Sequence, residues 1–195
     1  MNYIETVNQI YERIDVLINE NKGCIVAIDG RCGSGKTTLA NKLAEHYDAN
    51  LFQMDDFYLP FDMQTDQRLA LPGGHMDHER FFIEVIDPLL AQMTIIYRAF
   101  DCQKQAYNQG KQIPPKRINI IEGSYAMHPD LSSVYDLKVF MSVNPDEQMK
   151  RIQQRSGDVK AMRFKNLWIP MEEKYFEAFD IETQCDFVID TSEIW

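Results

Sequence analysis

The 195-residue sequence has no long apolar run and no excess of positive charge. Its apolar runs fall far short of the roughly 18 residues of a membrane span. Its first residues, MNYIETVNQIYERID, include acidic side chains. An export signal instead begins with basic residues and continues with an unbroken apolar run. The net charge of -10 argues against a surface that neutralises nucleic-acid phosphates. We therefore expect a cytoplasmic protein with neither a membrane nor a nucleic-acid partner, in which an anionic ligand needs a local basic pocket.

The sequence is also poor in cysteine and free of repeats and low-complexity tracts. The four cysteines (Cys24, Cys32, Cys102 and Cys185) are scattered and form no Cys-x-x-Cys pair, as is typical of a reducing compartment. The length suits a single domain over residues 1–195. Residues 109–116, with Gly110 and a Pro-Pro pair, are expected to form a surface loop.

Short apolar runs alternate with amphipathic helical patterns along the chain. An N-terminal helix is expected over residues 1–21. The strand-like runs are Cys24–Ile28, Leu51–Met54, Ile118–Ile121, Leu137–Val143 and Phe187–Ile189. The helical patterns between them are Thr37–Tyr47, Arg80–Met93 and Pro145–Arg155. Alternation of this kind predicts an α/β protein with a mainly parallel sheet wrapped by helices.

The stretch VAIDGRCGSGKTTLA fits a phosphate-binding loop, Gly-x-x-x-x-Gly-Lys-Thr, between a strand and a helix. Its glycines let backbone N–H groups point inward, and the following helix adds its positive N-terminal end. We expect Lys36 to reach the β and γ phosphates of ATP and the Thr37 hydroxyl to bind Mg²⁺. The residues expected to bind the nucleotide are Gly30, Arg31, Cys32, Gly33, Ser34, Gly35, Lys36, Thr37 and Thr38. The fold class is then a P-loop NTPase of three α/β/α layers.

Three of the strand-like runs end in an acid, namely Asp55, Glu122 and Asp190. In open α/β sheets the ligand crevice lies beyond the carboxyl ends of the strands, so such acids can converge on one site. A second metal ligand usually ends a strand beside the phosphate loop. Glu122 and Asp55 both qualify, with Glu122 binding Mg²⁺ directly or through water.

A nucleotide-binding loop serves switches, motors and kinases alike. A GTP switch needs Asn-Lys-x-Asp and Asp-x-x-Gly, and neither occurs in the sequence. A partner-driven ATPase would need additional subunit-facing parts such as a trans-acting arginine. Transfer of a phosphoryl group to a small-molecule hydroxyl acceptor is favoured, and it needs a base, cations on the developing charge and a lid that excludes water.

Candidates for all three parts are present. MDDFYLP offers Asp55 and Asp56 as bases beside Tyr58, an aromatic that can shape the pocket. Arg151 and Arg155 lie four residues apart on one helix face and can meet the same phosphate. The stretch after them carries Gly157, Lys160 and Arg163. We expect a small mobile cationic lid over about residues 156–169.

The motif PGGHMDHERFF contains His75, Asp77, His78 and Glu79. These residues resemble metal ligands, but His128 is distant in sequence and no cysteine stands at ligand spacing, so a zinc site is not favoured. A glycine-hinged loop that brings Asp77 and His78 to a sugar-like acceptor is the preferred interpretation. The alternative is that Asp77 caps the following helix.

The order of motifs resembles the group of P-loop kinases that contains uridine kinase, phosphoribulokinase and bacterial pantothenate kinase. The similar stretches are GRCGSGKT, MDDFYLP, DHERF, AFDCQ, NIIEGSYAMHPDL, YDLKVFMSV and DEQMKRIQQR, across roughly residues 22–190. The resemblance implies that Asp55 activates the acceptor hydroxyl and that Tyr58 lines the acceptor pocket. It also implies that Asp77 holds a ribose, that Asp101 lies near the nucleoside and that the two helix arginines clasp phosphates.

Two departures from the family bear on the substrate. The Asp-His-Pro element of the family is Asp-His-Glu here, and the His-Ser-Arg that follows Tyr-Asp in uridine kinases is absent from FDCQKQAYNQG. A uridine- or cytidine-like nucleoside is the leading acceptor, and a sugar phosphate or vitamin alcohol is the alternative. The sequence does not decide whether ATP or GTP is the preferred phosphate donor, or whether the protein is a homo-oligomer.

Overall fold

The computed structural model describes residues 3–21 and 23–194 and shows a five-stranded parallel sheet. The strands lie in the order β2-β7-β1-β8-β9. Their bounds are β2 Asn50–Gln53, β7 Ile118–Glu122, β1 Cys24–Gly30, β8 Leu137–Ser142 and β9 Phe187–Asp190. Each corresponds to one of the five apolar runs. The predicted α/β fold with a parallel sheet is therefore confirmed.

The central strand β1 explains why these runs are apolar without alternation. Every residue of β1 is buried, because helices cover both faces of a parallel sheet. It pairs with β7 from Cys24 to Ile28 and with β8 from Val26 to Gly30. Both pairs are parallel, so β1 and β7 end at the same edge, and Gly30 and Glu122 lie close to each other there.

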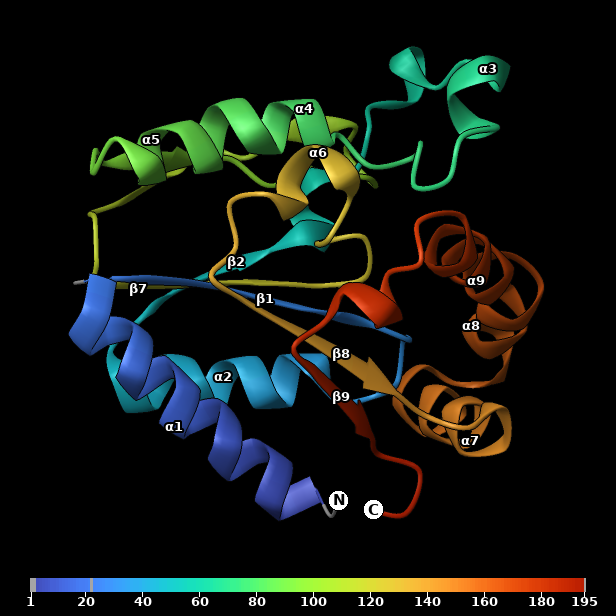
Figure 1. Cartoon of the computed structure of the whole chain (residues 1–195). Helices are drawn as coiled ribbons and strands as arrows, with labels where there is room; N and C mark the ends of the chain where they lie inside the picture. The colour runs from blue at the N-terminus through green and yellow to red at the C-terminus, as the bar shows by residue number, and fades with distance from the viewer. Residues whose placement is uncertain (1–2, 22, 195) are drawn as a thin grey trace.

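Two helical layers enclose the sheet (Figure 1). Helices α1 (Tyr3–Asn21) and α2 (Lys36–Tyr47) lie on one face, where their apolar side chains pack with those of β1 and β8 in one core cluster. The predicted N-terminal helix corresponds to α1, and residues 1 and 2 of that prediction lie outside the described residues. Within residues 3–21 and 23–194, none of the helices combines the length and apolarity needed to span a membrane.

The other face is covered by the helix predicted over Arg80–Met93, which begins earlier and has a π-helical turn in its middle. It consists of α4 (His78–Phe81), η3 (Phe82–Ile86) and α5 (Asp87–Leu90). The short helix α6 (Pro129–Ser132) lies beside it (Figure 1). Before α4, the chain forms η1 (Met54–Phe57), η2 (Phe61–Met63) and α3 (Asp66–Leu69).

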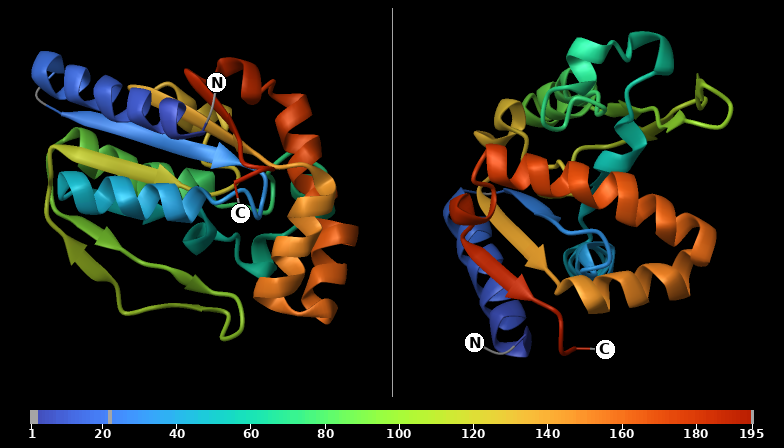
Figure 2. Two further views of the ribbon diagram at one scale, coloured as in Figure 1. Left: turned by 90° about the horizontal axis from the view of Figure 1, so that it is seen from below. Right: turned by 90° about the vertical axis from the view of Figure 1, so that its right-hand side faces the viewer.

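An arm of short antiparallel strands between α5 and β7 is absent from the sequence prediction. Strands β3 (Ile95–Tyr97) and β6 (Lys111–Ile113) pair with each other, as do β4 (Phe100–Asp101) and β5 (Ala106–Tyr107). The arm extends from the body of the molecule (Figure 2). The predicted loop over residues 109–116 is therefore partly wrong, because β6 lies within it.

The carboxyl edge of the sheet faces a group of helices. They are α7 (Pro145–Ser156), α8 (Asp158–Arg163), η4 (Phe164–Trp168) and α9 (Ile169–Ala178), followed by η5 (Glu182–Gln184). Helix α7 begins at Pro145 because Asn144 caps it, its side chain accepting a hydrogen bond from the N–H of Glu147 at 2.9 Å. The segment over residues 156–169 connects α7 to α9 and lies near the carboxyl end of β1 (Figure 2).

Candidate active site

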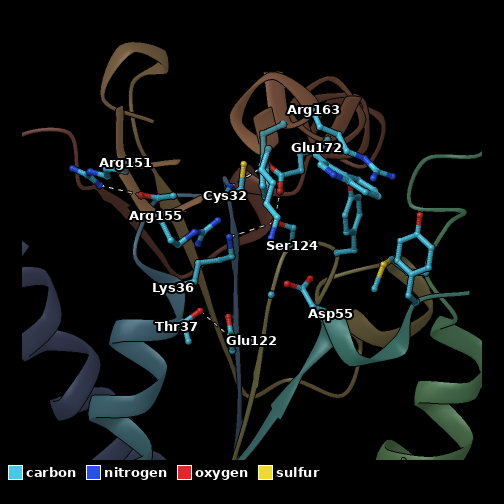
Figure 3. Close-up of a pocket in the computed structure, with 18 of the residues that line it drawn as sticks. Cys32, Lys36, Thr37, Asp55, Glu122, Ser124, Arg151, Arg155, Arg163 and Glu172 are labelled. Carbon is cyan, nitrogen blue, oxygen red and sulfur yellow. Dashed lines mark hydrogen bonds between the residues drawn. The ribbon is translucent and has the colours of Figure 1, made fainter. Parts of the chain in front are cut away.

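A cavity of about 990 Å³ opens at the carboxyl edge of the sheet. Its wall combines the phosphate loop, the ends of β2 and β7 and the helices α7 to α9 (Figure 3). The sequence-predicted residues that line it are Cys32, Gly33, Gly35, Lys36, Thr37, Thr38, Asp55, Tyr58, Glu122, Arg151, Arg155 and Arg163. Five of its lining residues are cationic (Lys36, Arg151, Arg155, Lys160 and Arg163), which supplies the local basic pocket expected in this acidic chain.

The phosphate loop has the backbone of an anion-binding nest. Gly30, Gly33 and Gly35 all have positive φ, and a Cβ at Gly30 would lie 2.1 Å from the carbonyl oxygen of Met141. Among the described residues, the backbone N–H groups of Gly33, Gly35, Lys36 and Thr37 have no hydrogen-bond partner. Unpaired donors at a helix N-terminus suit an anionic ligand.

The Lys36 ammonium is held by oxygens of the protein itself. Its Nζ donates to the carbonyls of Gly30 at 2.7 Å and Arg31 at 3.0 Å, and lies 3.3 Å from the hydroxyl of Ser124. The side chain lines the cavity and is 7% exposed. The cation is therefore already positioned beside the loop.

Two oxygen ligands suitable for Mg²⁺ meet beside Lys36. The Thr37 hydroxyl donates to Glu122 Oε1 at 3.1 Å, and both residues line the cavity. Burial raises the pKa of Glu122, Asp55 raises it further, and Lys36 opposes the shift. A divalent cation bound here would favour the ionised carboxylate.

The structure separates the two adjacent acids of MDDFYLP. Asp55 lines the cavity near Glu122 (Figure 3). The Asp56 carboxylate instead accepts a hydrogen bond from the Tyr97 hydroxyl at 2.7 Å. Asp55 is open to the cavity and otherwise surrounded by protein, which raises its pKa, while Lys36 lowers it. A carboxylate with a raised pKa at a cavity wall has the character of a general base.

The two arginines of α7 have different surroundings. Arg151 donates to the carbonyl of Gly33 at 3.2 Å and, through two nitrogens, to the hydroxyl and carbonyl of Thr191. It thus ties the phosphate loop to the segment after β9. The Arg155 guanidinium lies over the ring of Phe164, 5.7 Å from its centroid, and lines the cavity.

Two acids of α9 that the sequence analysis missed contact the phosphate loop. The buried Glu172 carboxylate accepts the N–H of Cys32 at 3.0 Å and the hydroxyl of Ser124 at 2.6 Å. Its neighbour Glu173 accepts both the Nε and Nη2 of Arg31, at 2.7 and 2.9 Å. Helix α9 is therefore attached to the loop at two points. An acid on a helix face carries no sequence signal that would have identified this contact.

Six predicted site residues do not line the cavity. In the loop these are Gly30, Arg31 and Ser34, and outside it Asp77, His78 and Asp101. Asp77 caps α4, since Oδ1 accepts the N–H of Arg80 at 3.1 Å, as the alternative interpretation of this motif expected. Asp101 accepts the N–H groups of Gln103 and Lys104 in the turn of the arm.

His78 lies against His128, which the sequence analysis treated as distant. The two rings stack with centroids 3.7 Å apart, and Asp130 Oδ2 lies 3.2 Å from His78 Nε2. Arg68 approaches His78 Nδ1 at 3.5 Å. Because arginine only donates, Nδ1 is the acceptor and Nε2 carries the proton toward Asp130. The imidazoles are stacked and not hydrogen-bonded to each other, and the potential ligand atoms of His78, His128 and Asp130 lie within 4.8 Å of one another.

An aromatic wall that was also missed lines the cavity next to Asp55 and Tyr58. It contains His75, Tyr125 and Trp168. Tyr125 has a positive φ of 74° and belongs to the Gly-Ser-Tyr that follows Glu122. Tyr125 could have been predicted from its position just after the end of a strand. His75 could have been predicted from the Gly-Gly pair that precedes it. Trp168 lies in the lid segment expected over about residues 156–169, but nothing in the sequence singled out its ring.

The sequence is similar to curated uridine kinases, although no protein-family profile matches it. It is 25% identical over 173 residues to the uridine kinase of Ligilactobacillus salivarius, covering 81% of each chain. It is 26% identical over 193 residues to that of Mycoplasma pneumoniae, covering 90% of this chain and 89% of the relative.

Solved structures give the same picture of the fold. A possible uridine kinase from Bacillus stearothermophilus superposes with a TM-score of 0.67 at 19% identity, over 93% of this chain and all of that one. A candidate fructose transport system kinase from Silicibacter gives 0.70 at 24%, over 97% and 99%. The chain thus has the fold of the P-loop kinases and, over most of its length, resembles curated uridine kinases.

Proposed function

We propose that the protein is an ATP-dependent small-molecule kinase that transfers the γ-phosphoryl group to a hydroxyl. The observation that carries this proposal is that unpaired loop N–H groups and the Asp55 carboxylate line one cavity. A phosphate donor and a group able to deprotonate an alcohol are thereby brought together. The similarity to uridine kinases supports the same reaction class.

The residues present fit ATP and Mg²⁺. The N–H groups of Gly33, Gly35, Lys36 and Thr37 would hold phosphate oxygens, and Lys36 would exchange its loop carbonyls for the β and γ phosphates. The Thr37 hydroxyl and Glu122 would hold Mg²⁺. The bound metal–nucleotide supplies the transferable phosphoryl group and neutralises part of its charge.

Each remaining part of the site has a role in transfer. Asp55 accepts the proton of the acceptor hydroxyl, which typically contributes about 10²- to 10⁴-fold in rate. Arg155 and Arg163 place cations near the transferred group, and Arg151 fixes the loop. We further propose that residues 156–169 act as a lid, because their side chains form one wall of the cavity.

For the acceptor we propose a uridine- or cytidine-like nucleoside. The similarity to uridine kinases and the aromatic wall beside Asp55 support it. The test is a screen of nucleosides, sugar phosphates and vitamin alcohols for ADP release with Mg²⁺ present. A rise of many-fold with one acceptor supports the kinase. ADP release that ignores every small molecule and responds only to a protein would identify a partner-driven ATPase instead.

A further inference from the structure

A cluster of two histidines and an acid lies outside the active-site cavity, where α4 and α6 are side by side (Figure 1). His78 belongs to α4, His128 is the N-cap of α6, and Asp130 lies in the first turn of α6. Both imidazoles are buried, whereas the Asp130 side chain is 61% exposed. The cluster therefore has a buried nitrogen side and an open oxygen side through which an ion can enter.

The distances from Asp130 to the two imidazoles match those between ligands of one tetrahedral ion. Ligand atoms about 2.0–2.1 Å from such an ion lie about 3.3–3.5 Å from one another. Asp130 Oδ2 is 3.2 Å from His78 Nε2 and 3.6 Å from His128 Nδ1. Glu79 also approaches His78 Nε2, at 3.6 Å, but Arg68 holds both of its oxygens. The three clustered residues therefore supply two nitrogens and one oxygen, with one position left for water.

The protons of the two rings are compatible with an ion. The N–H of Asp130 approaches His128 Nδ1 at 3.4 Å, so this nitrogen is unprotonated and has a lone pair. An ion would replace the proton on His78 Nε2, which moves to Nδ1 of the same ring. The 3.5 Å contact of Nδ1 with Arg68 would then be lost. The cost is small, because the same nitrogen of Arg68 keeps its bonds to Glu79 and to the carbonyl of Met76, at 2.7 and 3.0 Å.

The charges in the cluster also favour a cation. Burial lowers the pKa of both imidazoles, to about 4 for His128. The rings are therefore neutral at neutral pH, which is the form that binds metals. The Asp130 carboxylate thus faces two neutral rings, and a divalent cation would compensate its negative charge.

We propose that His78, His128 and Asp130 bind a divalent transition-metal ion such as Zn²⁺, with water completing its coordination. Imidazole nitrogens suit Zn²⁺, whereas Mg²⁺ prefers a shell of oxygens. The site is therefore distinct from the Mg²⁺ position proposed at Thr37 and Glu122, and it does not depend on the kinase function.

The ion would join two segments that form the active-site cavity. Residues 75–76, shortly before α4, and residues 123–125, shortly before α6, line that cavity. An ion between the two helices would therefore hold two walls of the cavity at a fixed separation.

The stacked arrangement of the rings must change when the ion binds. Their planes are 19° apart, and lone pairs that lie in nearly parallel planes do not converge on one point. The rings therefore turn toward each other around an ion. Of the four histidines in the chain, His78 and His128 should be the two whose imidazole NMR signals shift on addition of Zn²⁺.

Calorimetric titration of the full chain with ZnCl₂ tests the proposal, using protein without a polyhistidine tag and with Mg²⁺ in excess. We expect one Zn²⁺ ion per chain. Asp130→Asn should weaken binding at least tenfold, because loss of even an indirect partner of a metal typically costs about 10- to 100-fold in affinity. The side chain is exposed, so this variant should fold as the wild type does.

The matched control is Asp146→Asn. Asp146 is exposed and follows Pro145 in the first turn of α7, as Asp130 follows Pro129 in the first turn of α6. Both variants thus lose a negative charge at a helix N-terminus. A wild-type protein that binds no Zn²⁺, or equal affinity in the wild type and both variants, would overturn the proposal. Binding that Glu122→Gln abolishes and Asp130→Asn leaves unchanged would place the ion in the active site and overturn it as well.

Discussion

The Glu172 carboxylate accepts the Ser124 hydroxyl at 2.6 Å, and Ser124 in turn lies 3.3 Å from the Lys36 ammonium. A chain of contacts therefore runs from helix α9 through the strand end to the cation of the phosphate loop. The second oxygen of Glu172 holds the N–H of Cys32. The loop is thus shaped by a residue 140 positions later in the chain.

Glu172→Ala should destabilise the protein and weaken ATP binding. It leaves the Cys32 N–H without its acceptor, at a cost of about 1–3 kcal/mol, and leaves the Ser124 hydroxyl with only the carbonyl of Gly30 as an acceptor. Denaturant unfolding and titration with a fluorescent ATP analogue would measure both effects. Glu177→Ala, at an exposed position of the same helix, is the matched control. Equal stability of the two variants would contradict this assignment.

Asp55→Asn and Asp56→Asn should differ sharply in turnover although the residues are adjacent. The first removes the proposed base, so kcat should fall by about 10²- to 10⁴-fold while ATP affinity is largely kept. The second retains a side chain able to accept from the Tyr97 hydroxyl, so its kcat should stay within a few-fold of wild type. Acceptor-dependent ADP release at saturating ATP checks this. Near-normal turnover of Asp55→Asn would show that another group takes the proton.

Glu122→Gln should raise the Mg²⁺ concentration needed for half-maximal activity. It removes a negative charge from the oxygen pair formed with Thr37, and loss of a metal-positioning carboxylate typically costs about 10- to 100-fold in metal affinity. A Mg²⁺ titration at fixed ATP would measure the shift. Glu45→Gln, on the exposed side of α2, controls for the general loss of charge. An unchanged Mg²⁺ requirement would remove Glu122 from the proposed metal site.

Part of the pH dependence of the free energy of unfolding should come from His75. Its pKa is about 4 in the folded protein against an ordinary 6.5. Between these values the unfolded chain binds more protons, so the free energy of unfolding falls as the pH drops from 6.5 toward 4. His75→Phe lacks this contribution. Its loss of stability between pH 7 and pH 4.5 should be smaller than that of wild type by about 2 kcal/mol.

Denaturant unfolding at a series of pH values checks this prediction. Because the remaining titrating groups are common to both proteins, only the difference between the two pH profiles matters. Parallel profiles would show that His75 binds its proton equally well in the folded and unfolded chains.

The sheet and the phosphate loop could be predicted from the sequence because the patterns that indicate them lie within short stretches of the chain. An apolar run of the right length can only form a covered strand here, and the glycine spacing before Lys36 and Thr37 reflects a backbone path that few other residues permit. The position of Glu122 at the carboxyl edge of the sheet could be predicted for a related reason. An acid directly after a buried strand of a parallel sheet must lie at the edge where the other strands end.

The missed features depend on contacts between distant segments. The resemblance selected Asp55 as the base, but the letters MDDF did not show that Asp56 is bonded to Tyr97 of the arm. His78 and His128 meet because α6 packs beside α4, which no spacing rule predicts. The arm itself is built from strands of two or three residues, too short for a periodic pattern.

The oxygens around Lys36 have a consequence for selectivity. The Lys36 ammonium already has two carbonyl partners and a nearby hydroxyl. When an anion binds, the ammonium exchanges these neutral partners for a charged oxygen of the ligand. The net gain is then smaller for an anion that contacts Lys36 alone and larger for a polyanion that also engages the loop amides. The carbonyls of Gly30 and Arg31 therefore compete with any bound anion for the Lys36 ammonium, and a ligand that contacts both Lys36 and the loop amides offsets this cost best.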